Sequence, residues 1–293
     1  MRIRDIYRRA QFGLSIEIFP PKTPAGDETL RQALKRLAAY RPAFFSCTYG
    51  AGGSTRQRTV EWCVEIQQDL GIPATSHFTC VGSTVEELRE WLRLAGSEGI
   101  QNIMALRGDP PQGDEDFQAV DGGLQHANEL VEVIHREFPQ MGVAVAGYPE
   151  KHHEAPSMEV DLENLRRKVR CGADVVITQL FYINDDFYRF RQRCGQLGID
   201  VPIVPGLLPV TNLSQINRIT TLCAATLPTD FVNELGKHDD PDWQSKVGIE
   251  FAIRQVRDLL SQGVAGLHFY VLNKSEATSH VVAAVNLPVS VTS

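Results

Sequence analysis

The sequence lacks any apolar run that approaches the roughly 20 residues of a membrane-spanning helix, so we expect no membrane association. It also lacks a CxxC pair and any zinc-like spacing among its six cysteines. Several cysteines lie in apolar runs, a pattern typical of reduced core residues in a cytoplasmic protein. They are Cys47, Cys63, Cys80, Cys171, Cys194 and Cys223.

A surplus of positive charge is also missing, because the formal net charge is -7. Proteins that bind nucleic acid or anionic membranes need clustered Lys and Arg, so neither is an expected partner. The one exception is the basic start, with Arg2, Arg4, Arg8 and Arg9. No long apolar run or small-residue cleavage site follows it, and we therefore expect a plain solvated first helix.

Short apolar runs rich in β-branched residues recur along the chain, and the stretches between them have helical periodicity. Helices are predicted, for example, over 28–40, 84–99 and 161–172. Five of the seven intervals between the starts of successive runs are 28 to 32 residues long, the length of a strand–helix unit. The eight runs are LSIEIF from 14, AFFSCTY from 43, ATSHFTC from 74, NIMALRG from 102, GVAVAGY from 142, DVVITQLF from 174, PIVPGLL from 202 and GLHFYVL from 266.

Eight regularly spaced strands with apolar residues on both faces predict a closed (β/α)8 TIM barrel, an α/β fold in a single domain over residues 1–293. An open doubly wound sheet would have about six strands. The units share no repeated signature, which argues against a solenoid. The two longer intervals predict insertions, an acidic, glycine-rich loop at 109–123 and an additional helix and loop at 229–242.

Barrel enzymes carry their chemistry at the carboxyl ends of the strands, and this rule selects Glu17. Glu17 lies in an apolar strand closed by Pro20 and Pro21, where an ionised carboxylate is unfavourable unless it is paired. We therefore expect a raised carboxyl pKa, suited to a general acid. A salt bridge to a neighbouring strand is the alternative.

Several other polar groups follow the strands. Arg107 and Asp109 flank Gly108 at the end of the fourth run, either as a ligand contact or as a turn with an Arg–Asp pair. The glycines of YGAGGST (49–55) do not complete a GxGxxG fingerprint, because position 55 is Thr. They predict a tight loop before a capped helix, and a phosphate of a ligand near that loop is one interpretation.

A further group lies near the fifth run and on the helix after it. His152 and His153 are adjacent, so convergence on a metal is not expected, and His152 is interpreted as a ligand contact. Asp161, Asn164 and Lys168 share one helix face, with Arg167 alongside. That face is either a charged surface stripe or a binding site for a dinucleotide.

The sequence resembles the methylenetetrahydrofolate reductase family through blocks that occur in the family's order and cover nearly the whole chain. The resemblance is to the short bacterial form, so no regulatory domain is expected. The blocks are SIEIFPPKT (15–23), FSCTYGAGGSTRQRT (45–59), HFTC (77–80), MALRGDPP (104–111), AGYPEKHHEA (146–155), DLENLRRKV (161–169), ITQLFY (177–182), VPGLLPVTN (204–212) and HFYVLNK (268–274).

The resemblance implies a FAD-dependent enzyme that reduces 5,10-methylenetetrahydrofolate to 5-methyltetrahydrofolate with NADH or NADPH, in a ping-pong sequence that feeds methionine synthesis. It makes Glu17 the acid that protonates N10 of the folate, while Asp109 holds the pterin and influences the flavin. The implied FAD residues are Thr48, His77, Leu106, Arg107, Gly108, Asp109, Ala127, Tyr148, His152, Asp161, Asn164, Arg167 and Lys168. The implied folate residues are Asp109, Gln179, Leu213, Tyr270 and Lys274.

Three positions depart from the family pattern. Leu213 stands where an aromatic residue often packs on the ligand, Lys274 replaces an Arg, and His126 replaces a Tyr beside the flavin. The resemblance also implies a homo-oligomer, without a choice between dimer and tetramer, and leaves NADH against NADPH open.

Two other functions stay open from the sequence. One is a different flavin barrel, such as a proline-dehydrogenase-like enzyme, which would hold an amino-acid carboxylate instead of a pterin. The other is a non-catalytic folate- or flavin-binding protein, in which Glu17 would be dispensable.

Overall fold

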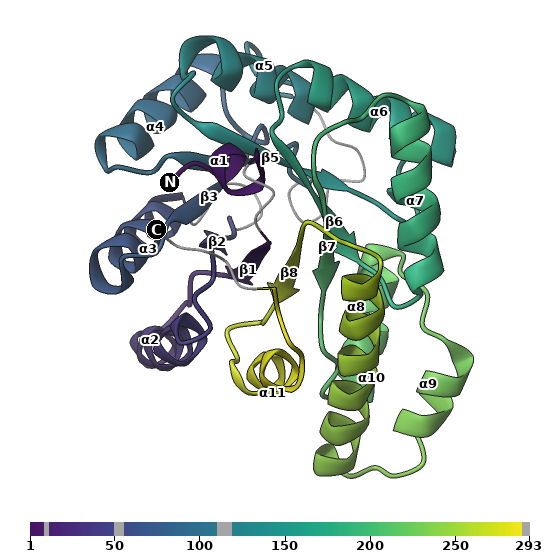
Figure 1. Ribbon diagram of the computed structural model, residues 1–293. Coiled ribbons are helices and arrows are strands. Elements are labelled where there is room, and N and C mark those ends of the chain that lie inside the picture. The colour runs from purple at the N-terminus through teal and green to yellow at the C-terminus, as the bar shows by residue number, and fades with distance from the viewer. Residues whose placement is uncertain (9–11, 50–55, 110–118, 289–293) are drawn as a thin grey trace.

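The computed structural model describes residues 1–8, 12–49, 56–109 and 119–288. Its centre is a closed barrel of eight parallel strands in chain order, with β8 paired back to β1 (Figure 1). Each strand coincides with one of the eight predicted runs, so the predicted TIM barrel is confirmed. The strands are β1 (Gly13–Ile18), β2 (Phe44–Cys47), β3 (Ala74–Thr79), β4 (Asn102–Leu106), β5 (Gly142–Gly147), β6 (Val175–Leu180), β7 (Ile203–Leu207) and β8 (Gly266–Tyr270).

Helices alternate with the strands and cover the outside of the barrel (Figure 1). The predicted helices over 28–40, 84–99 and 161–172 correspond to α2, α4 and α6. The helices of the described residues are α1 (Ile3–Arg8), α2 (Pro24–Ala38), α3 (Arg56–Leu70), α4 (Val85–Ser97), α5 (Ala127–Glu137), α6 (Met158–Arg170), α7 (Asn184–Gln196), α8 (Leu213–Cys223), α9 (Thr229–Leu235), α10 (Pro241–Ser261) and α11 (Glu276–Ala284).

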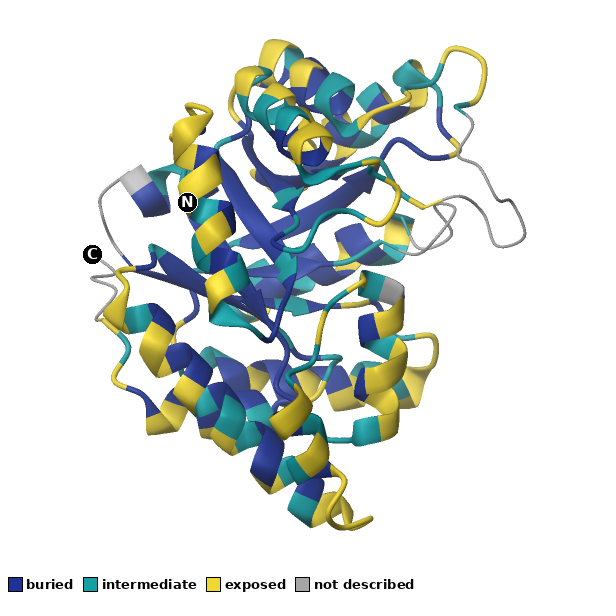
Figure 2. Ribbon diagram, turned by 90° about the vertical axis from the view of Figure 1, so that its right-hand side faces the viewer, coloured by how far each residue is buried: buried dark blue, intermediate teal, exposed yellow. Residues whose placement is uncertain are grey.

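Side chains that alternate along each strand divide the core in two. Those on the outer face, such as Ile16 and Leu267, pack under the helices, and the strands are almost wholly buried in Figure 2. The inner face carries an apolar cluster in the half of the barrel nearest the amino ends of the strands, where Phe44, Met104 and Val204 pack together. The ionisable side chains of Glu17 and His77 lie in the other half, which we call the polar half of the barrel.

Helix α1 closes the apolar end of the barrel. Its Ile3, Ile6 and Tyr7 are buried in the same cluster as Phe44 and Met104. The prediction of a plain solvated first helix is therefore wrong. The four arginines suggest a charged surface helix, whereas the apolar residues at i, i+3 and i+4 determine how the helix packs.

The insertion between β7 and β8 contains the predicted additional helix, α9, followed by the long helix α10. Together with α8 they enclose a satellite core that includes Tyr182, Phe231 and Val247. Two other predicted loops fall largely outside the described residues. These are the glycine loop at 50–55 and most of the insertion at 109–123.

Gly248 lets α10 approach the loop after β7. A Cβ atom at this position would stand 1.8 Å from the carbonyl oxygen of Val210. We expect Gly248→Ala to lower the free energy of unfolding by about 3 kcal/mol, because backbone must shift to admit the methyl group. Urea denaturation measures the change.

Gly195 provides the matched control, since it lies in α7 and a Cβ atom added there would have no neighbouring atom within 4 Å. Gly195→Ala should raise stability by up to about 1 kcal/mol through helix propensity. Equal stability of the two variants would contradict the packing of α10 against this loop.

Candidate active site

Glu17 lies on the inner face of β1, in the polar half of the barrel. One oxygen of its carboxylate is 3.3 Å from His77 Nε2 of β3 and 3.5 Å from His268 Nε2 of β8. Ser46 Oγ donates a long hydrogen bond of 3.5 Å to the same oxygen. The Glu17 side chain is 16% exposed, whereas that of His268 is fully buried. The Glu17 carboxylate therefore remains partly accessible from the barrel mouth.

The pKa of Glu17 does not behave as its apolar strand suggests. Burial acts to raise the pKa, but the charges and close contacts of His77 and His268 outweigh it and hold the pKa at about 2. The expectation of a raised pKa is therefore wrong for the ligand-free protein. The alternative, pairing with another strand, is what the structure contains, with His268 of adjacent β8 as one partner.

His268 is a site residue that the sequence did not single out. Its Nδ1 lies 2.8 Å from Ser15 Oγ, so Ser15, His268 and Glu17 form a continuous polar chain across β8 and β1. The run GLHFYVL predicts an apolar strand and no more. Its period of two, with Gly266, His268 and Tyr270 all on the inner face, was the available signal.

A cavity lies beside the carboxyl ends of β4 and β5 and extends along α6. Arg107 and Lys168 bring positive charge to it, and Asp161 and Asn164 bring hydrogen-bonding groups. Asp161, Asn164 and Lys168, predicted to share one helix face, all line this cavity. Nine residues predicted from the resemblance to hold FAD line it, namely Leu106, Arg107, Ala127, Tyr148, His152, Asp161, Asn164, Arg167 and Lys168.

Lys168 is the innermost cation of this cavity. Its Nζ donates a 2.6 Å hydrogen bond to the carbonyl oxygen of Ala146 and lies 5.9 Å from the ring centroid of Tyr148. Burial lowers the Lys168 pKa to about 8, with the charge of Asp161 opposing that shift. An anion that entered the cavity would stabilise the charged form of Lys168 and so raise this pKa.

The loop between β5 and α6 closes one side of the cavity. Asp161 Oδ2 accepts a 3.1 Å hydrogen bond from the backbone N–H of His152. Burial, and then the charge of His153, lower the His152 pKa to about 4, so this ring is neutral at pH 7. Glu154 forms a two-fold ion pair with Arg107, in which Nη2 donates to Oε1 at 2.7 Å.

The remaining predicted FAD residues lie outside this cavity. Thr48 follows β2, His77 is beside Glu17, and Asp109 is exposed just after Gly108. Gly108 has a φ of +90°, and a Cβ there would meet Val81 Cγ1 at 2.7 Å, so both backbone and packing require glycine. Arg107 forms an ion pair with Glu154, a partner that the turn interpretation with its Arg–Asp pair did not include.

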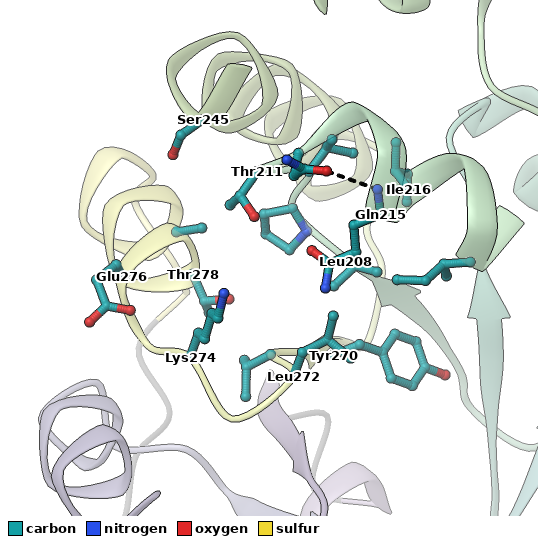
Figure 3. Close-up of a pocket in the computed structure, with 16 residues that line it drawn as sticks. Leu208, Thr211, Gln215, Ile216, Ser245, Tyr270, Leu272, Lys274, Glu276 and Thr278 are labelled. Carbon is teal, nitrogen blue, oxygen red and sulfur yellow. Dashed lines mark hydrogen bonds between the residues drawn. The ribbon is translucent and has the colours of Figure 1, made fainter. Parts of the chain in front are cut away.

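A second cavity lies between the loop after β7, helix α8 and the start of α11 (Figure 3). Tyr270 and Lys274, both predicted folate residues, line it together with Thr211 and Gln215. The Tyr270 hydroxyl donates a 2.8 Å hydrogen bond to the carbonyl oxygen of Thr178. Tyr270 therefore links β8 to β6.

The other predicted folate residues occupy different positions. Gln179 lies near the carboxyl end of β6. Its Oε1 accepts a 2.9 Å hydrogen bond from the backbone N–H of Leu180. Leu213 begins α8 and packs against the satellite core. Leu213 lines neither of the two cavities, so the structure does not bring it together with Tyr270 and Lys274.

Within the described ranges, no group of three or more His, Cys, Asp and Glu side chains is placed to hold a metal ion. The rings of His152 and His153 stack on each other, 4.5 Å apart. No helix in the described part of the chain combines the length and apolar character of a membrane span.

The fold and the site define the class: a (β/α)8-barrel enzyme with its polar site at the carboxyl ends of the strands. The family model described as methylenetetrahydrofolate reductase matches residues 2–286. The chain therefore belongs to the methylenetetrahydrofolate reductase family.

Relatives of known name support this assignment. The chain is 38% identical over 269 residues to 5,10-methylenetetrahydrofolate reductase of Escherichia coli (strain K12), covering 92% of this chain and 88% of that protein. It is 36% identical to methylenetetrahydrofolate reductase (NADH) 1 of Arabidopsis thaliana, covering 98% of this chain. The chain spans 50% of that plant protein's length.

Among solved structures, a similar fold occurs in an uncharacterised Clostridium thermocellum protein that binds two copies of 5-methyl-5,6,7,8-tetrahydrofolic acid. The TM-score is 0.65 at 14% identity, covering 96% of this chain and 97% of that chain. At that identity the likeness establishes the barrel fold alone.

Proposed function

We propose that this protein reduces 5,10-methylenetetrahydrofolate to 5-methyltetrahydrofolate, with FAD as bound cofactor and NADH or NADPH as reductant. The observation that carries the proposal is a partly buried acid, Glu17, at the same end of the barrel as a cation-lined cavity, in a chain of this family. The names of the bacterial and plant relatives agree with this chemistry.

The residues present fit FAD. A dinucleotide carries a pyrophosphate, for which Arg107, Arg167 and Lys168 provide three cations among the residues that line the cavity. Asp161 and Asn164 provide partners for hydroxyl groups. When bound, FAD would accept hydride from the nicotinamide and deliver it to the folate. The protein's part is to hold the dinucleotide, neutralise its phosphates and keep the neutral His152 ring against it.

Folate would occupy the mouth between the two cavities. Lys274 would offer a positive charge to an anionic group of the folate, and Tyr270, which lines the same cavity, would contact the ligand together with Gln179 and Asp109. Because Leu213 packs into the satellite core, we expect it to contribute shape to α8 and no stacking contact. We therefore expect aromatic stacking to contribute less to folate affinity here than in relatives with an aromatic residue at this position.

Glu17 would supply the proton. Its low pKa in the ligand-free protein depends on His77 and His268, while burial already acts in the opposite direction. A ligand that covers the mouth removes the remaining solvent from the carboxyl group and so raises its pKa. We infer that Glu17 takes up a proton when folate binds and donates it to the folate nitrogen.

Four further properties of the family go with this proposal. They are a cytoplasmic location, a homo-oligomer, the use of NADH or NADPH as reductant and a supply of methyl groups for methionine synthesis. A proline-dehydrogenase-like activity has less support, because the family match spans residues 2–286. Substrate-dependent reoxidation of the flavin, by folate or by proline, separates the two activities.

Asp109→Asn tests the assignment of the folate side. Asp109 is exposed at the end of β4 and lies outside the dinucleotide cavity. We expect the folate half-reaction to slow by about 10-fold to 100-fold through loss of one charged contact, with the FAD dissociation constant changed less than about threefold. Stopped-flow absorbance and flavin fluorescence titration measure the two quantities. A folate half-reaction at the wild-type rate would remove Asp109 from the site.

A further inference from the structure

Lys151 has an unusual backbone conformation in the loop between β5 and α6. Its φ is +82°, in the left-handed region where a residue with a Cβ is strained. Glycine would adopt this conformation freely. A lysine can persist there only if contacts of its side chain offset the backbone strain, and those contacts are present.

The Lys151 ammonium donates hydrogen bonds to three backbone carbonyls of the same loop. Its Nζ lies 3.0 Å from the oxygen of His152, 3.4 Å from that of His153 and 2.6 Å from that of Ala155. An additional hydrogen bond of 3.0 Å runs from the Ala155 N–H to the His152 oxygen. The Lys151 ammonium therefore connects three carbonyl groups of the turn 152–155.

This turn carries two groups into the dinucleotide cavity. The first is His152, whose N–H is bound by Asp161, and the second is Glu154, which holds the Arg107 guanidinium. Lys151 is not among the residues that line the cavity. Its ammonium therefore acts on the ligand site through the turn and not by contact.

We propose that Lys151 is a positioning residue for the dinucleotide cavity. Its ammonium, hydrogen-bonded to the carbonyl oxygens of the turn 152–155, fixes the positions of His152 and Glu154. This inference rests on the proposed function for the identity of the ligand. It goes beyond that function because it assigns part of the affinity to a residue that does not touch the cofactor.

Two variants separate the ammonium from the backbone requirement. Lys151→Gly removes the three hydrogen bonds and relieves the strain, whereas Lys151→Met removes them and keeps the strain. We expect the FAD dissociation constant of Lys151→Gly to rise by about tenfold, as for loss of a charge-assisted contact, and that of Lys151→Met to rise at least as much.

Arg41→Gly is the matched control. Arg41 is another cationic residue in the left-handed region, with a φ of +51°, and it is exposed in the turn after α2. This substitution should leave the FAD dissociation constant unchanged. If Lys151→Gly binds FAD as tightly as wild type, the residue only satisfies a turn conformation and the inference is overturned.

Amide hydrogen exchange of the flavin-free protein decides the inference even if the proposed function is wrong. In Lys151→Gly we expect the His152 amide to exchange about tenfold faster, because the turn that holds it against Asp161 opens more readily. Unchanged exchange would overturn the inference. Failure of the wild-type protein to bind FAD would instead count against the proposed function and leave the exchange result valid.

Discussion

Glu17→Gln is expected to slow flavin reoxidation by methylenetetrahydrofolate by about 10²-fold to 10⁴-fold, the range lost when a general acid is removed. Reduction of the flavin by NADH should stay within a few-fold of wild type, since the proposed mechanism requires no proton from Glu17 there. The amide keeps the size of the side chain but cannot donate the acidic proton. Anaerobic stopped-flow absorbance resolves the two half-reactions.

Glu150→Gln is the control for this substitution. Glu150 lies on the loop after β5, where one carboxylate oxygen accepts a 2.9 Å hydrogen bond from the Thr226 N–H. An amide oxygen can accept the same bond, so both half-reactions should proceed at nearly the wild-type rate. If Glu17→Gln slowed both half-reactions equally, its role would be structural and not that of an acid.

We expect Lys168→Met to weaken FAD binding by about 100-fold, because the cavity would lose its most buried cation and, on the proposed function, a charge-assisted hydrogen bond to a phosphate. The measurement is a titration of the flavin-free protein, followed by flavin fluorescence. Arg170→Met removes the same charge from an exposed position on the same helix, outside the cavity lining. That control should bind FAD within about twofold of wild type, as expected for a solvated charge.

The same lysine predicts a pH dependence. Its pKa is lowered to about 8 in the ligand-free protein, and an adjacent phosphate would raise it. Below pH 8 the ammonium is already charged, so affinity is constant. Above pH 8, binding must take up a proton, and the FAD dissociation constant should rise with pH. Lys168→Met should lack this rise, and a rise of equal size in the variant would exclude Lys168 as its source.

The sequence was sufficient for the barrel because strands buried on both faces are apolar throughout and recur at the length of a strand–helix unit. It also predicted the α6 wall, since the spacing of Asp161, Asn164 and Lys168 determines which face they share. The packing of α1 was missed because its arginines dominate a short segment, and the stripe of Ile3, Ile6 and Tyr7 spans barely more than one turn.

The electrostatics of Glu17 could not be predicted from its own strand. Apolar neighbours on β1 give burial, which raises a carboxyl pKa, but the deciding groups are His77 on β3 and His268 on β8. They approach Glu17 only when the barrel closes. Lys151 was missed for a different reason, because its proposed role depends on a left-handed φ and on three nearby carbonyl oxygens whose positions the sequence does not reveal.

The most direct test of the proposed function is an anaerobic two-step titration of the FAD-loaded protein, followed by flavin absorbance. NADH is added first and 5,10-methylenetetrahydrofolate second. We expect NADH to bleach the flavin and the folate to restore its oxidised spectrum. Bleaching without recovery would remove folate as the substrate, and a protein that cannot be loaded with FAD would contradict the cofactor assignment itself.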